Sequence, residues 1–217
     1  MPYLRQFLEL KCSGDVINSV FPIRETTKEI SESMSIVKRI KKILVLNPNI
    51  YTVFDLCAGN CLTSSLVAHL FKIKHVYAID KAERHRDGFS KIRNFSYLKT
   101  DILQNKDLLI KIIHKSSPAI IISVHPCCDL AQHIIDIYKR SNADYLCLMP
   151  CCHGRLLENY PTFVENKLSK YELWCLDLCK QMKGSGNIDK HCLSEKNIVI
   201  ISSRKNDEIL DEDGEKE

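Results

Sequence analysis

The stretch that decides the fold spans residues 53–64 and reads Val53-Phe54-Asp55-Leu56-Cys57-Ala58-Gly59-Asn60-Cys61-Leu62-Thr63-Ser64. An apolar strand over residues 51–54 is followed by a loop of small residues and then by a helical pattern over residues 62–71. A small-residue loop between strand and helix lets the backbone approach a ligand, and the first helical turn offers free N–H groups. We therefore expect the loop from Asp55 to Asn60 to bind a ligand.

Strand and helix patterns alternate along most of the remaining chain. Residues 118–124 are the clearest buried strand, because they are almost wholly apolar. This alternation predicts an α/β fold of the Rossmann-like kind, with a mostly parallel, twisted sheet of six or seven strands and helices on both faces. Further strands are expected at residues 75–79, 95–98, 144–149 and 198–202, and helices at residues 82–92, 103–114, 130–140 and 162–182.

The two ends of the chain differ from this alternating pattern. Residues 1–49 read as a helical N-terminal segment, in which Thr26 or Thr27 caps an amphipathic helix that extends through Ile40. The last eleven residues contain seven acids and one lysine, which is typical of a disordered acidic tail. We accordingly divide the chain into an N-terminal segment at 1–49, a main domain at 50–206 and a tail at 207–217.

Composition and charge limit the compartment and the partners. The chain is 45% hydrophobic and 27% charged, as expected for a protein with an apolar core. It has neither a run of roughly 18 apolar residues nor a signal-peptide pattern, so we expect no membrane association and a cytoplasmic or nuclear location. The net charge is +4, but the acidic tail leaves +10 on the rest of the chain. That basic body suits RNA, with no DNA partner expected, although a solvated lysine-rich surface explains the charge equally well.

An acidic residue lies at or just after the end of each of the first three predicted strands. Asp55 follows the first, and Asp80, with Lys81 beside it, follows the second, where a carboxylate can accept both hydroxyls of a ribose. The third ends in Thr100-Asp101-Ile102. The polar and acidic side chains there could form hydrogen bonds with the edge of an adenine, and the apolar one could pack on its face. Open α/β sheets bind ligands at the carboxyl ends of their strands. Because the first loop opens on an acid, it suits a positively charged amine rather than a pyrophosphate.

At these residues the chain resembles the class I methyltransferases that use S-adenosyl-L-methionine (SAM), over roughly residues 50–150. The loop of that family usually reads acid-x-Gly-x-Gly-x-Gly, and this chain has Cys57, Gly59 and Cys61 at the glycine positions. The resemblance implies SAM as the cofactor. It also implies the cofactor-binding set Asp55, Cys57, Ala58, Gly59, Asn60, Asp80, Lys81, Thr100, Asp101, Ile102 and His125, with Asp55 at the methionine amine, Asp80 at the ribose and Asp101 at the adenine.

Two loops with paired cysteines indicate a particular branch within the methyltransferases that this chain resembles. His125-Pro126-Cys127-Cys128-Asp129 follows the fourth strand, and Pro150-Cys151-Cys152-His153 follows the fifth. The chain resembles a methyltransferase branch with His-x-Cys-x-Asp and Pro-Cys-Cys loops, which includes tRNA 2′-O-methyltransferases and RNA-adenine-dimethylase-like proteins. This branch implies a methyl-transfer site between the two loops, formed by His125, Cys127, Asp129, Cys151 and His153.

The chemistry required of these loops is modest, because SAM is already an activated donor and the protein mainly aligns the nucleophile. His125 or Asp129 could take the proton of a hydroxyl nucleophile. Asp129 is equally suited to cap the next helix, and His125 to bond the backbone at the strand end. The chain lacks the Asn-Pro-Pro-Tyr motif typical of enzymes that methylate amines, so O-methylation of tRNA or rRNA is favoured.

The paired cysteines also raise the question of a metal. Zinc sites favour Cys-x₂₋₄-Cys spacing, and directly adjacent side chains tend to point apart. We therefore expect no bound metal, and instead expect small, polarisable side chains packed beside the sulfonium of the cofactor.

Two other functions are compatible with the same residues. One is an enzyme that methylates a protein or a small molecule. The other is a scaffold with the SAM-binding fold but no catalysis, which the two missing glycines would explain.

Overall fold

The computed structural model describes residues 2–83, 86–156, 159–165 and 167–204, so the predicted acidic tail at 207–217 lies outside the described residues. One seven-stranded sheet forms the centre of the described chain, in the order β3-β2-β1-β4-β5-β7-β6. The strands are β1 (Thr52–Leu56), β2 (His75–Asp80), β3 (Phe95–Lys99), β4 (Ala119–Val124), β5 (Tyr145–Met149), β6 (Ser185–Ile188) and β7 (Ile198–Ser203). The helices are α1 (Pro2–Leu8), α2 (Ser13–Val20), α3 (Thr26–Leu46), α4 (Leu62–Leu70), α5 (Lys106–Lys115), α6 (Leu130–Arg140), α7 (Thr162–Glu165) and α8 (Lys170–Met182), with a 3₁₀ helix η1 at Asp87–Lys91.

The first five strands pair in parallel and confirm the predicted fold class. Alternate residues of these strands face opposite sides of the sheet, so each strand contributes to two apolar cores. On β4, for example, Ile120 and Ile122 belong to one core and Ile121 to the other. A strand buried on both faces must be apolar throughout, which is why residues 118–124 were recognisable from the sequence.

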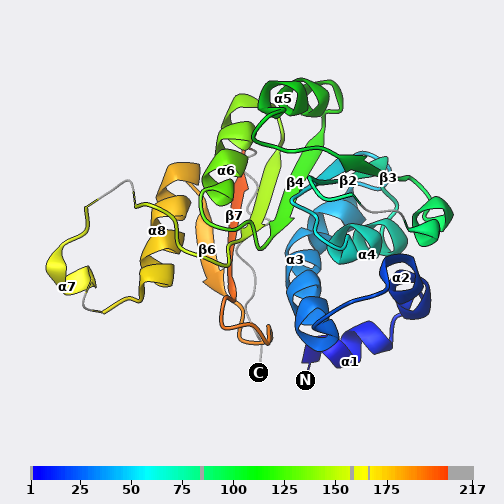
Figure 1. Ribbon diagram of the computed structural model, residues 1–217, viewed down its shortest axis with the longest axis horizontal. Helices are drawn as coiled ribbons and strands as arrows, with labels where there is room; N and C mark the ends of the chain where they lie inside the picture. Colours follow the sequence, from blue (N-terminus) through cyan, green and yellow to red (C-terminus); the bar gives the residue numbers. More distant parts are fainter. Residues whose placement is uncertain (1, 84–85, 157–158, 166, 205–217) are drawn as a thin grey trace.

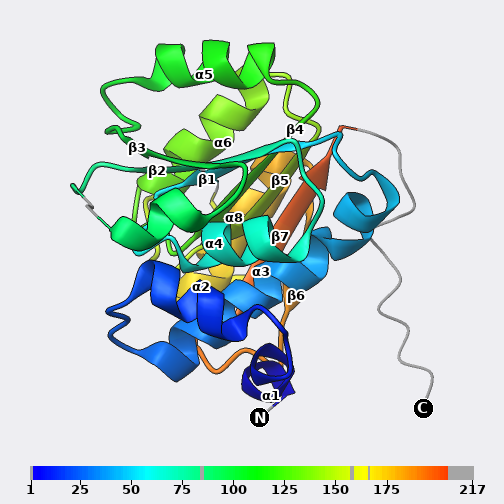
Figure 2. The ribbon, with the colours of Figure 1, turned by 90° about the vertical axis from the view of Figure 1, so that its right-hand side faces the viewer.

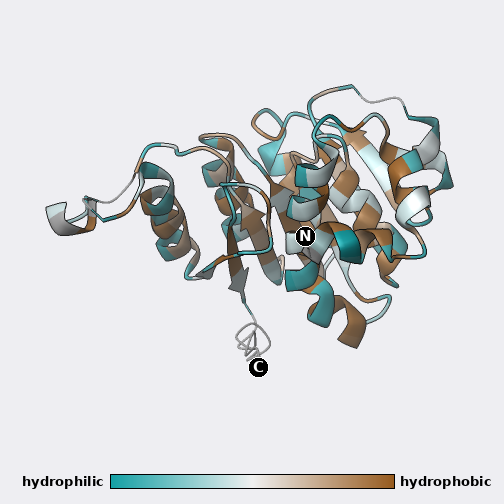
Figure 3. Ribbon diagram, turned by 90° about the horizontal axis from the view of Figure 1, so that it is seen from below, coloured by the Kyte–Doolittle hydropathy of each residue, from teal (hydrophilic) through white to brown (hydrophobic). Residues whose placement is uncertain are grey.

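Helices cover both faces of the sheet (Figure 1). Figure 2 shows α5 and α6 on one side of the sheet and α1 to α4 on the other, while α8 packs with α6. The strands are strongly hydrophobic and the helices carry both apolar and polar residues, as Figure 3 shows. None of the helices in the described part of the chain combines the length and the apolar character that a bilayer span requires.

The N-terminal segment contributes directly to this arrangement through α3. The N-cap is Glu25 rather than Thr26 or Thr27, so the helix begins at Thr26, and it continues to Leu46, six residues beyond the predicted end. Ile36 and Ile40 are fully buried in the same core as the strands. Because α3 packs against α4, β4 and β5, its first turns lie near the carboxyl ends of the strands.

The helix predicted at residues 82–92 is wrong. Within the described part of this stretch, only the short 3₁₀ helix η1 is helical, and it packs against α2. The sequence there has no apolar stripe to bury, and Gly88 is a poor helix former.

The single helix predicted at residues 162–182 is also wrong, because the described residues divide into α7 and α8. Ser169 starts α8 with a capping box: its hydroxyl accepts the Glu172 N–H at 3.2 Å, and its own N–H donates to the Glu172 carboxylate at 2.7 Å. These reciprocal bonds satisfy two N–H groups that a helix start leaves unpaired, so they fix the new start.

The predicted loop around Gly184 and Gly186 in fact contains a strand, β6. Its sequence has no alternating apolar pattern, and it is extended because it pairs antiparallel with β7. Strand β7 in turn runs antiparallel to β5, which settles the direction of the last predicted strand and makes the sheet seven-stranded.

Candidate active site

A cavity of about 580 Å³ opens at the carboxyl ends of β1, β2 and β4. Strands β1 and β4 are neighbours, but the chain leaves β1 toward β2 and β3 before it returns to β4. This reversal of strand order is the point at which open α/β sheets bind ligands. The cavity is lined by Pro22, Arg24, Glu25, Lys28, Glu29, Glu32, Ser33, Cys57, Ala58, Gly59, Asn60, Leu62, Thr63, Asp80, Arg86, Val124, His125, Cys127 and Leu130.

The loop after β1 forms one wall of the cavity, as predicted. Its turn is fixed by backbone bonds from Ala58 N–H to the Ile79 carbonyl at 3.0 Å and from Cys61 N–H to the Ala58 carbonyl at 2.8 Å. Cys57, Gly59 and Cys61 all have positive φ, of 62°, 55° and 68°. The two cysteines thus keep the left-handed backbone for which the family uses glycine, at some steric cost.

Asp80 joins the second strand to this loop. Its carboxylate accepts the N–H groups of Gly59 and Ala82, each at 2.9 Å. A carboxylate has about four lone-pair positions, so two remain for a ligand in the cavity that Asp80 lines. Asp80 therefore lines the cavity, and its predicted contact with a ribose stays a prediction.

Asp55 lies behind the loop rather than in the cavity lining. It is 1% exposed, and the Ser64 hydroxyl donates a hydrogen bond to its carboxylate. Burial, opposed by the Ser64 hydrogen bond and reinforced by the nearby Asp80, raises the pKa of Asp55 to about 7. The structure therefore gives Asp55 a partner within the protein, whereas the sequence had suggested direct contact with an amine.

Helix α3 supplies a wall that the sequence reasoning missed. Glu25, Glu29 and Glu32 line the cavity from one side of this helix. The side chain of Asn60 donates a hydrogen bond to Glu29, and the hydroxyls of Ser33 and Thr63 are 2.9 Å apart, so α3 is joined to the loop and to α4. The available signal was the recurrence of acids three and four residues apart on an otherwise amphipathic helix.

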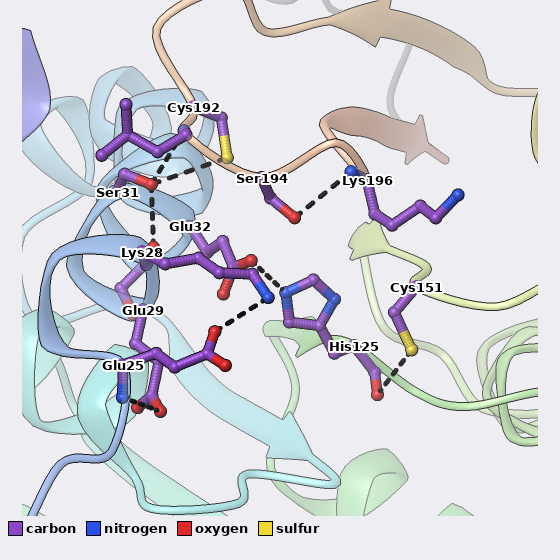
Figure 4. A network of polar contacts seen from close by, with 12 residues as sticks. Glu25, Lys28, Glu29, Ser31, Glu32, His125, Cys151, Cys192, Ser194 and Lys196 are labelled. Carbon is purple, nitrogen blue, oxygen red and sulfur yellow. Dashed lines mark hydrogen bonds and ion pairs between the residues drawn. The ribbon is translucent and has the colours of Figure 1, made fainter.

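An ion pair between Glu32 and His125 connects α3 to the loop after β4 (Figure 4). The His125 Nε2 atom lies 2.6 Å from Oε1 of Glu32, and the two side chains are 26% and 3% exposed. His125 is held by a backbone bond from its N–H to the Met149 carbonyl at 2.8 Å, and its φ is 57°. A buried carboxylate on a histidine fixes the orientation of the ring.

Several predicted site residues do not line the cavity. The Asp101 carboxylate accepts the Leu103 N–H at 2.8 Å in a local turn, Ile102 is buried in the core, and Lys81 is exposed. Thr100 is fixed by a backbone bond from its N–H to the Asp80 carbonyl at 2.8 Å. Of the three acids at the strand ends, only Asp80 therefore lines the cavity.

The acceptor loops are also only partly in the cavity. His125 and Cys127 line it, whereas Asp129, Cys151 and His153 do not. Asp129 is the N-cap residue of α6, as the alternative interpretation held, but its side chain makes no capping bond.

The expectation that adjacent cysteines point apart is wrong for Cys151 and Cys152, whose sulfurs are 3.4 Å apart. The Cys127 sulfur is 3.3 Å from that of Cys151. Burial, together with these two neighbouring thiols, raises the pKa of Cys151 well above its usual value.

The residues present fit SAM. The cavity volume is within the range of about 300–1,000 Å³ that is usual for small-molecule sites. Nothing lies within 4 Å of the point where a Cβ would stand on Gly59, so this part of the loop faces open space. The backbone of Cys57 to Asn60 and the Asp80 carboxylate would hold the cofactor, which when bound supplies an activated methyl group.

The strand order and the position of the cavity define a Rossmann-like class I methyltransferase fold. A family model described as a methyltransferase domain matches residues 25–159, which is more than half of the chain. The chain therefore belongs to that family, and its methyltransferase domain implies SAM as the methyl-donor cofactor. The match begins at the start of α3, the helix that closes the cavity.

One solved structure has a similar fold, and a second has a lower TM-score. The CurJ carbon methyltransferase is 14% identical to this chain with a TM-score of 0.54, and the match covers 89% of this chain and 63% of that one. This chain thus spans less than two thirds of the length of that protein. The methyltransferase domain of bacterial CtHen1-CN is 12% identical with a TM-score of 0.45, over 81% of this chain and 98% of that one. No curated protein matches the sequence.

Proposed function

We propose that this enzyme methylates RNA, in tRNA or rRNA, at a hydroxyl oxygen, in the cytoplasm or nucleus. The observation that carries the proposal is the ion pair between His125 and Glu32 in the wall of the cofactor cavity. A hydroxyl must lose a proton when it accepts a methyl group, and an oriented imidazole is the side chain best suited to take it near neutral pH.

The geometry gives His125 a defined role in this proposal. If the ring donates its Nε2 proton to Glu32, then Nδ1 carries the lone pair that accepts the substrate proton. Nδ1 has no hydrogen-bond partner among the described residues, and the Nε2–Glu32 contact, although 2.6 Å long, lacks hydrogen-bond geometry, so the ring would have to turn slightly to donate. Glu32 would stabilise the positive charge that the ring gains, as the carboxylate does in other oriented histidine sites.

Basic side chains around the same cavity support an RNA acceptor. Arg24, Lys28 and Arg86 line it, and Arg24 and Lys28 are exposed. The hydrogen bond from Lys28 to Glu25 raises the pKa of Lys28, which keeps this lysine charged. These three cations share the lining with Glu25, Glu29, Glu32 and Asp80, so the support for RNA also depends on the +10 charge of the chain outside its acidic tail, which suits salt-dependent contacts with phosphates.

The proposal is tested by incubating the enzyme with methyl-labelled SAM and fractionated cellular RNA, followed by digestion to nucleosides. Label in a 2′-O-methylated nucleoside is the expected result. The variant His125→Gln should lower the rate about 10²–10⁴-fold, the usual contribution of a general base, with the Kd for SAM changed by less than about threefold. His133→Gln is the matched control, because His133 lies on α6 away from the cavity lining.

Two results would contradict the proposal. Label that resists ribonuclease and is released by protease would indicate a protein acceptor. RNA binding that does not weaken between low and moderate salt would remove the electrostatic argument for a polyanionic substrate.

A further inference from the structure

Four cysteines gather where the loops after β4 and β5 leave the sheet. The sulfurs of Cys127, Cys151 and Cys152 all lie within 4.8 Å of one another. Cys128 interacts with Cys152, but its sulfur is not among those that all lie within 4.8 Å of one another, so it would have to move to become a ligand. The eleven cysteines of the chain all lie in its described part, and none of them forms a disulfide there.

The strands beneath hold these loops in a fixed relation. β4 and β5 pair in parallel up to Val124 and Met149, so the two cysteine pairs begin at the same level of the sheet. Cys128 has a left-handed φ of 50°, which turns the first loop within its cysteine pair. Backbone geometry, rather than sequence spacing, thus brings together cysteines 24 residues apart in the chain.

We propose that Cys127, Cys151 and Cys152 bind one thiophilic metal ion of the Zn²⁺ type, with Cys128 as the fourth ligand. Zinc is held by thiolates at about 2.3 Å in a tetrahedron, whose edges are then about 3.8 Å long. The observed separations of 3.3 and 3.4 Å, within an overall limit of 4.8 Å, are close to that geometry. Each thiol would release its proton as it binds.

The ion would serve the acceptor side of the active site. Cys127 both belongs to the cluster and lines the cavity. The thiols of Cys127 and Cys151 each lie 3.6 Å from the His125 carbonyl, so the cluster surrounds the backbone that carries the histidine. A metal at this point would tie the two loops together beside the cavity, whatever the methyl acceptor is.

The experiment measures metal binding directly and needs no methyl acceptor. The full chain, purified under reducing and anaerobic conditions, is analysed for metal by mass spectrometry. The metal-free protein is then titrated with Co²⁺, which reports tetrahedral thiolate coordination by its visible and near-ultraviolet absorption. We expect one equivalent of zinc and one equivalent of Co²⁺ with thiolate charge-transfer bands. Cys151→Ser should weaken Co²⁺ binding at least tenfold, and Cys12→Ser, outside the cluster, should leave it unchanged.

The wild-type titration keeps the proposal open to refutation even if Cys151→Ser does not fold. Cys128→Ser, at an exposed position, is the second variant and should also weaken Co²⁺ binding. The proposal is wrong if the reduced wild-type protein contains less than a tenth of an equivalent of metal and shows no thiolate bands when Co²⁺ is added. Unchanged Co²⁺ binding in both cluster variants overturns it as well.

Discussion

The loop after β1 and the loop after β4 occupy neighbouring positions in the sheet, yet they are stabilised in different ways. Both use left-handed backbone at non-glycine residues: Cys57 and Cys61 in the first, His125 and Cys128 in the second. The first is held by backbone hydrogen bonds and by the Asp80 carboxylate. The second depends on side chains, namely the Glu32 ion pair and a group of thiols. Backbone hydrogen bonds occur in both loops, since His125 N–H also donates to the Met149 carbonyl, but only the second loop has an ion pair and clustered thiols.

The largest expected effect concerns Asp55, the buried acid behind the cofactor loop. Its folded pKa of about 7 lies above the unfolded value of about 3.9, so its contribution to stability is full below about pH 4 and is lost as the pH rises to about 7. Over that window it should lower the free energy of unfolding by about 4 kcal/mol, at up to about 1.4 kcal/mol per pH unit. Asp55→Asn should remove this slope, as measured by urea unfolding at several pH values. Parallel curves for the two proteins would show that Asp55 titrates normally.

The next effect concerns the ion pair that supports the acceptor loop. His125→Ala leaves the Glu32 carboxylate buried without the imidazole that faces it, so it should cost about 3 kcal/mol of stability. Glu32→Gln in the same chain should recover most of that loss, because the orphaned charge is gone. A double-mutant cycle by chemical denaturation measures this coupling. Strictly additive losses would mean that the two side chains do not interact.

On the cofactor side, Asp80→Ala should weaken SAM binding about 100-fold, or about 2.7 kcal/mol, because it removes ligand contacts and loosens the Gly59 turn. The melting temperature should change little, since Asp80 is at the end of its strand. Calorimetric titration measures the affinity, and Asp107→Ala, on the surface of α5, is the control. An unchanged Kd would mean that Asp80 does not contact the cofactor.

The smallest expected effect concerns the backbone strain in the cofactor loop. Cys57→Gly should be about 1 kcal/mol more stable than Cys57→Ala, because only the alanine retains a Cβ at positive φ. Comparing the two variants, rather than each with wild type, cancels the loss of the thiol. Equal unfolding free energies would show that this position carries no strain.

The parallel core was predictable because its strands are apolar runs and its helices have clear ends. Residues 130–140 were assigned as a helix with both ends correct. The wrong secondary-structure predictions lie where strand pairing or helix capping outweighs the local hydrophobic pattern. β6 is a strand only because β7 lies beside it, and α8 starts at Ser169 through a two-residue reciprocal bond.

The candidate site divides in the same way. The loop after β1 and Asp80 could be proposed as site residues from the sequence, because they are adjacent in the chain or stand at equivalent ends of neighbouring strands. Glu32 was missed because it lies 93 positions before its partner His125, on a helix that precedes the strands. Only packing of α3 over β4 and β5 brings them together.

The sequence by itself thus determined the α/β class and the small-residue loop after β1, since these follow from the local hydrophobic period and from residues adjacent in the chain, and its resemblance to a known family indicated the class of enzyme. The tertiary structure alone decided the acidic wall from α3, the ion pair between Glu32 and His125, and the clustering of three thiols from two loops. Those contacts join residues far apart in the chain, and their distances depend on how helices and strands pack rather than on spacing along the sequence.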